Sequence, residues 1–173
     1  MRLWEVGNCP SFHRIRSVGG RLRIWKRPSD HHRQVIIWDD AKQKVAVQIP
    51  VLTTVRGVKL TRTHIVVALH NSTRVYKFQT QPELWAAFET ADNPLGLCCL
   101  TSKTVTFPGR TPGQVQLVDL ATGSVSIIPA HGSSLRALEI SRDGKILATA
   151  SDKVGFLDCY LLNCFQQSIS RAL

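Results

Sequence analysis

Hydrophobic and polar residues alternate along most of the chain in short runs, and turn-forming residues separate one run from the next. Such runs, rich in Val, Ile and Thr, predict β-strands, whereas the spacing of an amphipathic helix is scarce. The predicted strands are Gln34–Trp38, Lys44–Ile49, Thr54–Leu60, His64–Leu69, Thr73–Phe78, Leu95–Leu100, Thr104–Pro108, Gln114–Leu120, Ser124–Ile128, Leu135–Ile140 and Ile146–Ala150. The last two are joined by SRDG, in which Gly144 can adopt a positive φ. The pattern predicts an all-β fold.

These strands also repeat along the chain. Trp38, Tyr76 and Val118 end comparable strands at separations of 38 and 42 residues, and a polar turn and another alternating strand follow each of them. A period near 40 residues with four short strands per period is typical of a β-propeller. An immunoglobulin-like sandwich, which also consists of many short strands, remains the alternative.

Charge separates the first part of the chain from the rest. Apolar residues make up 43% of the sequence, which is a globular composition, and the net charge is +10. Residues 1–33 hold eight Lys and Arg residues against two acidic ones. We therefore expect a basic N-terminal segment (1–33), followed by propeller blades (34–153) from the strand repeat; the family resemblance given below implies that 154–173 is a divergent C-terminal tail.

The basic segment could attract phosphate on nucleic acid or lipid, or acidic proteins, or it could be solvated without a specific partner. Trp25 among its cations could stack on bases. No recognised nucleic-acid-binding module is present, so we expect no nucleic-acid partner.

Candidate chemistry elsewhere is sparse. The five cysteines form no CxxC pair, which indicates buried thiols in a reduced, intracellular protein. Neither a GxSxG elbow nor a P-loop occurs, and no His or Cys cluster has metal-ligand spacing. We expect no enzyme activity, no cofactor and no metal. The longest apolar tract, near Gly155–Phe165, is too short for a spanning helix, so we expect any membrane contact to be peripheral.

Several ordered motifs carry a resemblance to a known family. They are VGG (Val18–Gly20), VIIWDD (Val35–Asp40), THIVVALHNSTRVYKF (Thr63–Phe78), ADNPLGLCCL (Ala91–Leu100), FPGRTPGQVQLVDL (Phe107–Leu120) and AHGSSLRALEISRDGKILATASDK (Ala130–Lys153). Over about Val18–Lys153 the chain resembles the PROPPIN (WIPI) family, seven-bladed WD-repeat propellers that bind phosphoinositides, and in particular its fungal members. The resemblance implies a partial propeller that corresponds to about blades two to five of seven.

The resemblance also implies a function. The family binds phosphatidylinositol 3-phosphate or the 3,5-bisphosphate as a cytoplasmic scaffold of autophagy and protein transport, peripheral on phagophore, endosomal or vacuolar membranes. His131, Thr149 and Ser151 match the fifth-blade side of its first headgroup pocket. As alternatives, His131 could form a hydrogen bond within the blade, and Thr149 and Ser151 could satisfy backbone groups at a strand end.

Two departures from the family pattern concern binding. After Lys153 the sequence continues VGFLDCYLL, and no Arg-Arg pair, which the family uses for the headgroup, occurs in the chain. Arginine binds phosphate through a bidentate fork, so we expect impaired lipid binding. We also expect that a frameshift or altered splicing produced the change after Lys153.

A second surface is implied on the second and third blades, where the family docks a lipid-transfer protein of autophagy. The candidate loops are Asp39–Gln43, Thr61–His64 and Gln79–Trp85, with Asp39, Asp40, Arg62 and Trp85 as candidate contacts. Trp85 near Pro82 is the sharpest candidate, because an exposed aromatic residue near a turn often anchors a partner. Ordinary hairpin turns remain the alternative. If this surface acts alone, the protein is a lipid-independent WD-repeat interaction platform.

Overall fold

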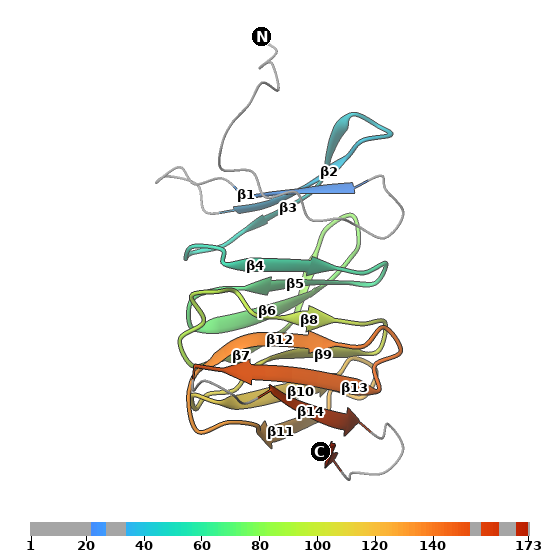
Figure 1. Cartoon of the computed structure of the whole chain (residues 1–173). Coiled ribbons are helices and arrows are strands. Elements are labelled where there is room, and N and C mark those ends of the chain that lie inside the picture. Colours follow the sequence, from blue (N-terminus) through green and yellow to red (C-terminus); the bar gives the residue numbers. More distant parts are fainter. Residues whose placement is uncertain (1–21, 27–33, 153–156, 163–168, 173) are drawn as a thin grey trace.

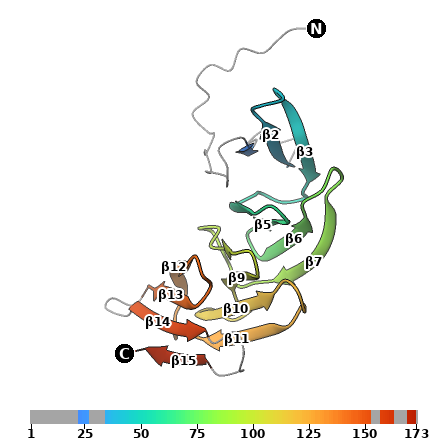
Figure 2. The same ribbon diagram turned by 90° about the vertical axis from the view of Figure 1, so that its right-hand side faces the viewer.

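The strands of the protein form four antiparallel sheets that follow one another along an open arc (Figures 1 and 2). The computed structural model describes residues 22–26, 34–152, 157–162 and 169–172. Within each sheet, strands that are consecutive in the sequence are hydrogen-bonded neighbours. The all-β prediction is therefore confirmed, and no helix long and apolar enough to cross a bilayer occurs in the described residues.

Each sheet is one blade of the propeller. The first contains β1 (Leu22–Lys26), β2 (Gln34–Asp39) and β3 (Lys44–Pro50). The second contains β4 (Gly57–Leu60), β5 (His64–Ala68), β6 (Ser72–Lys77) and β7 (Glu83–Glu89). The third contains β8 (Cys99–Leu100), β9 (Thr104–Pro108), β10 (Gln114–Asp119) and β11 (Val125–Pro129). The fourth contains β12 (Leu135–Ile140), β13 (Ile146–Ser151), β14 (Leu157–Leu162) and β15 (Ile169–Ala172).

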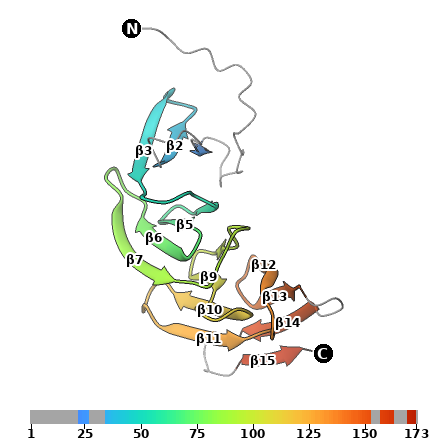
Figure 3. The ribbon, with the colours of Figure 1, turned by 90° about the vertical axis from the view of Figure 1, so that its left-hand side faces the viewer.

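The sequence repeat coincides with the blades. Trp38, Tyr76 and Val118 lie near the ends of β2, β6 and β10, which are the penultimate strands of their sheets. The short strand β8 contacts both β4 and β12, so these three strands line the inner side of the arc, whereas β7 and β11 are the last strands of their sheets (Figure 3). The predicted period of about 40 residues is therefore confirmed as one blade per repeat.

Among the residues whose burial is described, the core consists of three apolar clusters, one between each pair of neighbouring sheets. Val47 and Ile49 of the first sheet pack with Ile65 and Tyr76 of the second, and Val75 packs instead with Val105 and other residues of the third. Because successive side chains of a strand point to opposite faces, one strand supplies residues to two clusters. Buried runs such as residues 65–69 (IVVAL) result from this packing on both faces.

The adjacent thiols of Cys98 and Cys99 follow the same rule. Both are buried, as predicted for small apolar thiols; Cys98 packs in the cluster between the second and third sheets, and Cys99 packs in the cluster between the third and fourth. The thiol of Cys99 donates a hydrogen bond to the carbonyl oxygen of Leu138 on β12 (3.1 Å). Burial raises the pKa of this thiol to about 12, so at neutral pH it is protonated.

Most predicted strands are confirmed, but several boundaries are wrong. The strand predicted over Leu95–Leu100 is only β8, because the residues before it form a turn. Asn93 makes this turn: its side chain accepts a hydrogen bond from Leu97 N (2.8 Å) and donates one to Leu97 O (3.0 Å). Gly96 completes it with a φ of 66°. Similarly, the strand predicted from Thr54 begins only at Gly57.

The structure also contains strands that the hydrophobic pattern did not predict. β7 covers Glu83–Glu89, whereas the sequence predicts a loop over Gln79–Trp85, so Trp85 lies in a strand and not in a turn. Charged residues at both ends of β7 and two alanines at its centre obscure the alternation. β1 lies within the predicted basic segment 1–33, and β14 and β15 lie within the predicted tail 154–173.

Candidate functional site

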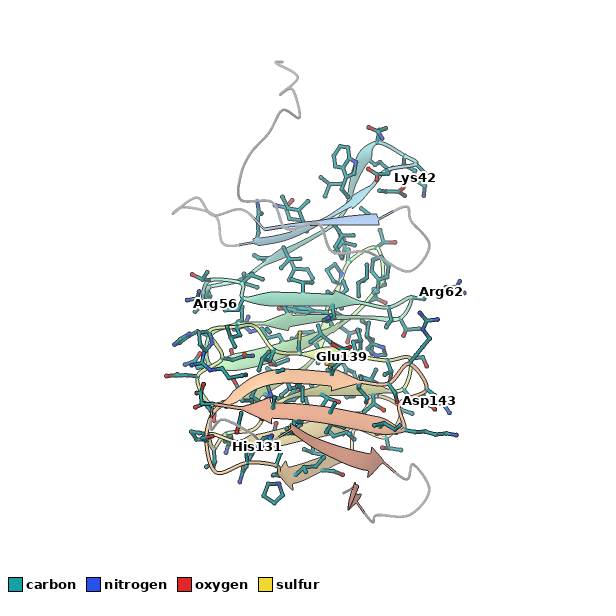
Figure 4. All side chains as sticks on the ribbon, in the orientation of Figure 1. Lys42, Arg56, Arg62, His131, Glu139 and Asp143 are labelled. Carbon is teal, nitrogen blue, oxygen red and sulfur yellow. The ribbon has the colours of Figure 1, made fainter. Side chains whose placement is uncertain are left out.

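The connections between strands lie at two ends of the blades, because consecutive antiparallel strands run in opposite directions. We call the end with the hairpins β2–β3, β4–β5, β6–β7, β8–β9, β10–β11 and β12–β13 the turn face. The opposite end, with the connections β3–β4, β5–β6, β7–β8, β9–β10 and β11–β12, is the loop face. Figure 4 shows Arg62 and Asp143 at the turn face and Arg56 and His131 at the loop face.

His131 and Thr149 meet at the loop face of the fourth sheet. His131 lies in the β11–β12 connection, and its Nε2 is 2.9 Å from the hydroxyl oxygen of Thr149 on β13. Thr149 is fully buried and His131 is half-buried. The buried hydroxyl of Thr149 is thus in hydrogen-bond contact with the imidazole, and His131 is the residue of the pair that is more accessible to solvent.

Ser151 lies at the last position of β13, two residues after Thr149. Because side chains two apart in a strand share a side of the sheet, Ser151 is on the same side as Thr149. It is half-buried. Next to it, Asp152 forms an ion pair with Arg136 of β12. The structure therefore brings the three predicted headgroup residues together at the loop face, where the connection from the third blade enters the fourth.

The main chain of His131 is held by the neighbouring blade. Its N–H donates a hydrogen bond to the carbonyl oxygen of Gly113 (3.0 Å), which lies in the β9–β10 connection. Gly113 was not predicted as a functional residue from the sequence. The available signal was the PG dipeptide in FPGRTPG, which is typical of a turn that needs a positive φ.

Asp39, a candidate partner contact, closes its own hairpin on the turn face. Its carboxylate accepts hydrogen bonds from the backbone N–H groups of Ala41 (3.0 Å) and Lys42 (3.2 Å). The carbonyl oxygen of Asp40 accepts from the Gln43 side chain (2.7 Å). These contacts support the hairpin-turn interpretation of the two aspartates.

Asp119 has the same position in the third blade as Asp39 has in the first. It accepts hydrogen bonds from the N–H groups of Ala121 (2.8 Å) and Thr122 (2.8 Å). The N–H of Thr122 is the main cause that holds the pKa of the Asp119 carboxyl below its usual value. Hydrogen bonds to the charged form favour that form, so ionised Asp119 stabilises its turn.

The turns between the first two strands of the second to fourth blades begin with a hydroxyl residue: Thr61, Thr101 or Ser141. Each hydroxyl accepts a hydrogen bond from a backbone N–H of its own turn, such as Thr104 N to Thr101 Oγ1 (2.9 Å). Arg62 is exposed in the first of these turns and makes no ion pair among the described residues.

Trp85 is half-buried in β7 and packs against the apolar cluster between the second and third sheets. Its ring meets the imidazole of His64 edge to face, with ring centroids 6.1 Å apart. Burial, and secondarily the charge of Lys77, lowers the pKa of His64. Trp85 is therefore partly a core residue, and only part of its ring is available to a partner.

A groove lies between the first and second sheets and was not predicted from the sequence. It has a volume of ≈ 590 Å³ and is lined by residues 45–50 of β3, Tyr76, residues 80–82 and Leu84. Val45 and Leu84 are 45% and 49% exposed. Its lining is mostly apolar, so it could hold an apolar segment of a partner. Among the described residues, no group of three or more His, Cys, Asp or Glu side chains could hold a metal ion.

Comparison with known proteins supports this architecture. No protein-family model matches the sequence. SVP1-like protein 2 of Emericella nidulans is 54% identical over 127 residues, which cover 73% of this chain and 40% of that protein. Autophagy-related protein 18e of Arabidopsis thaliana is 37% identical over 149 residues, which cover 80% of this chain and 40% of that protein.

Solved structures share the fold at low sequence identity. The structure of Kluyveromyces lactis Hsv2p matches with a TM-score of 0.73 and 18% identity over 88% of this chain and 48% of that chain. KlAtg21, solved in complex with the coiled coil of AgAtg16, matches with a TM-score of 0.70 and 14% identity over 87% of this chain and 52% of that chain.

The fold is therefore a partial β-propeller, with four blades formed by the described residues. Together with the named relatives, it shows that the chain belongs to the PROPPIN family. The chain spans less than half the length of the curated relatives that it matches.

Proposed function

We propose that this chain is part of a phosphoinositide-binding scaffold of autophagy without enzyme activity. The scaffold would be cytoplasmic and peripheral on phagophore, endosomal or vacuolar membranes. The observation that carries the proposal is the His131–Thr149 pair, with Ser151 on the same side, at the loop face of the fourth sheet. Membership of a family with autophagy-related relatives supports the assignment.

The chemistry of the pair suits an inositol phosphate. An imidazole and a hydroxyl can donate hydrogen bonds to phosphate oxygens, and a protonated imidazole adds a positive charge. Because Thr149 is fully buried and bonded to His131, we assign it to holding the ring. His131 and Ser151 are then the residues that contact the headgroup, which is that of phosphatidylinositol 3-phosphate or the 3,5-bisphosphate.

We further propose that these 173 residues bind the lipid weakly. They contain no Arg-Arg pair, and one charged hydrogen bond contributes about 1.5–3 kcal/mol. The absence of several such bonds lowers affinity by orders of magnitude.

A second candidate function is a lipid-independent interaction platform, and the groove between the first and second sheets favours it. Its apolar lining, with Leu84 half exposed, could receive an apolar segment of a lipid-transfer protein of autophagy. Arg62 at the turn face and the exposed part of Trp85 would add contacts. The solved complex of KlAtg21 with a coiled coil gives one instance in which a protein of this fold binds a protein partner.

Vesicle flotation tests the first function. The chain is mixed with phosphatidylcholine vesicles with or without phosphatidylinositol 3-phosphate, as wild type, His131→Ala or His70→Ala. His70 is the matched control, since it is another partly exposed loop-face histidine, 3.6 Å from Asp92 and outside the predicted pocket. We expect weak flotation that requires the phosphoinositide, is reduced at least about tenfold by His131→Ala and is unaffected by His70→Ala.

The outcomes separate the two functions. Identical flotation with and without the phosphoinositide would overturn lipid recognition by this chain and leave the interaction platform. Phosphoinositide-dependent flotation that survives His131→Ala would retain the function but refute the residue assignment. For the platform, Leu84→Asp should abolish capture of the lipid-transfer protein, whereas Ile127→Asp, an exposed apolar position of β11 outside the groove, should not.

A further inference from the structure

Gly113 lies in a turn whose backbone conformation favours glycine over residues that have a side chain. Residues 111–114 make a tight turn in which Gln114 N donates to Thr111 O (3.1 Å), with Pro112 and Gly113 in the middle. The φ of Gly113 is 84°, as expected at the third position of a type II turn. Thr111 and Pro112 are exposed, but Gly113 itself is buried, so the glycine end of this turn lies against another part of the protein.

That other part is the connection that carries His131. The carbonyl oxygen of Gly113 accepts the His131 N–H (3.0 Å). A Cβ atom at position 113 would lie 2.0 Å from the carbonyl oxygen of His131 and 2.8 Å from that of Ser133. Both atoms belong to the backbone, so they can move away only if the whole connection moves. Only glycine permits this approach.

His131 is therefore held at two points by two blades. Its main chain is fixed by Gly113 of the third sheet, and its ring is fixed by Thr149 of the fourth sheet. We propose that Gly113 is a positioning residue for the headgroup site: it sets where the imidazole of His131 stands relative to Ser151. This inference rests on the proposed function only where it predicts an effect on lipid binding. The positioning of His131 by Gly113 can be measured without lipid.

The arrangement has a consequence for recognition of the inositol phosphate. If all the binding residues belonged to one blade, their relative positions would not change when neighbouring blades shift. Here any displacement of the third blade against the fourth moves the His131 backbone while Thr149 and Ser151 stay on β13. The relative placement of the imidazole and the serine hydroxyl thus depends on the junction between two blades, with Gly113 as the contact point.

Two alanine variants at glycines of this region give a matched pair. Gly113→Ala introduces the clash, whereas Gly132→Ala, next to His131, adds a Cβ that meets nothing within 4 Å. Gly96→Ala controls for general destabilisation, because it disturbs the junction between the second and third sheets instead. The measurements are hydrogen exchange of the His131 amide and the nitrogen chemical shifts of its ring, with vesicle flotation as a separate arm.

We expect the His131 amide of the wild type to exchange at least about tenfold more slowly than in an unstructured peptide. In Gly113→Ala this protection should disappear and the ring shifts should change, while both remain as in wild type in Gly132→Ala. Gly96→Ala should lower global stability without a selective change at His131. Flotation on phosphatidylinositol 3-phosphate vesicles should fall in Gly113→Ala about as much as in His131→Ala.

An unprotected His131 amide in the wild type would overturn the proposal, and this result does not depend on whether Gly113→Ala folds. Unchanged exchange and ring shifts in a folded Gly113→Ala would overturn it as well. If the wild type does not recognise phosphoinositide at all, the proposed function fails, yet the exchange and shift measurements still decide whether Gly113 positions His131.

Discussion

On the turn face five of the six hairpins are closed by side chains of their own turns, whereas on the loop face residues of neighbouring blades also hold one another. Thr61, Thr101 and Ser141 bond to the backbone of their own turns, and so do Asp39 and Asp119. The loop face instead has contacts between blades: Gly113 with His131, Gly57 with Gly96, and the ion pair of Arg110 with Glu89.

This difference indicates which changes spread through the molecule. A lost bond in a hairpin affects a few residues, because its partners are adjacent in the sequence. A lost contact on the loop face changes how one blade sits against the next. Since His131 lies on the loop face, a shift between blades should change the geometry of the candidate lipid site. Arg62 lies in a hairpin on the turn face, so the same shift should affect it less.

The largest expected effect tests this distinction with two glycines of similar φ. At Gly96 (φ 66°) a Cβ would lie 2.4 Å from the carbonyl carbon of Arg56, whereas at Gly123 (φ 74°), on the turn face, it would meet only Trp85 at 3.9 Å. Gly96→Ala should lower the free energy of unfolding by about 3 kcal/mol. Gly123→Ala should cost only the left-handed backbone penalty of about 1 kcal/mol. Urea denaturation measures both, and equal losses would contradict the difference between the faces.

A smaller effect is expected from Asp119 on the turn face. Because the pKa of Asp119 is lowered in the folded protein, its ionised form stabilises the fold above the unfolded pKa of about 3.9, and this stabilisation is lost as the pH falls through the folded value. Asp119→Ala should cost about 1 kcal/mol at pH 7, by analogy with other capping side chains.

Stability measured between pH 7 and pH 3 gives the check. The gap between wild type and Asp119→Ala should narrow as the pH falls below about 4. Hydrogen exchange in the variant should quicken only in the β10–β11 hairpin. A gap that does not change with pH, or exchange that quickens at the blade junctions, would show that this turn is not a local unit.

The smallest effect concerns the ion pair between blades. Arg110 Nη2 lies 2.7 Å from Glu89 Oε2, but the two side chains are 70% and 75% exposed. A double-mutant cycle of Arg110→Ala and Glu89→Ala should therefore give a coupling of at most about 0.5 kcal/mol, weaker in high salt. A coupling above about 2 kcal/mol would mean that charge, and not close backbone contact, holds the loop face together.

The sequence predicted local features well. The strand positions follow from the alternation of hydrophobic and polar residues, and the blade period follows from the spacing of Trp38, Tyr76 and Val118. Both features could be predicted because they depend on residues that are near one another in the sequence. The SRDG turn is also a local feature that the sequence predicts correctly, since Gly144 has the expected positive φ (74°). β7 was partly missed, because its packing on the third sheet, such as the ring contact of Phe88 with Phe107 (5.1 Å), is visible only in three dimensions.

The candidate site was predicted from resemblance and not from spacing. His131 and Thr149 are 18 residues apart, and only the β12–β13 hairpin and the preceding connection bring them together. Gly113 is a further 18 residues before His131 in another blade, so no local pattern connects the two. The groove was not predicted for the same reason, since its walls come from two blades.

Cys98 and Cys99 offer a way to watch the blades separate. They are adjacent in the chain, yet they lie in apolar clusters on opposite sides of the third blade. Because the Cys99 thiol ionises only near pH 12 while it is buried, a thiol reagent at neutral pH reacts with it mainly in molecules that have opened. Labelling of Cys98 therefore records opening toward the second blade, and labelling of Cys99 records opening toward the fourth. The two thiols, one residue apart in the chain, therefore report on the opening of two different blade junctions.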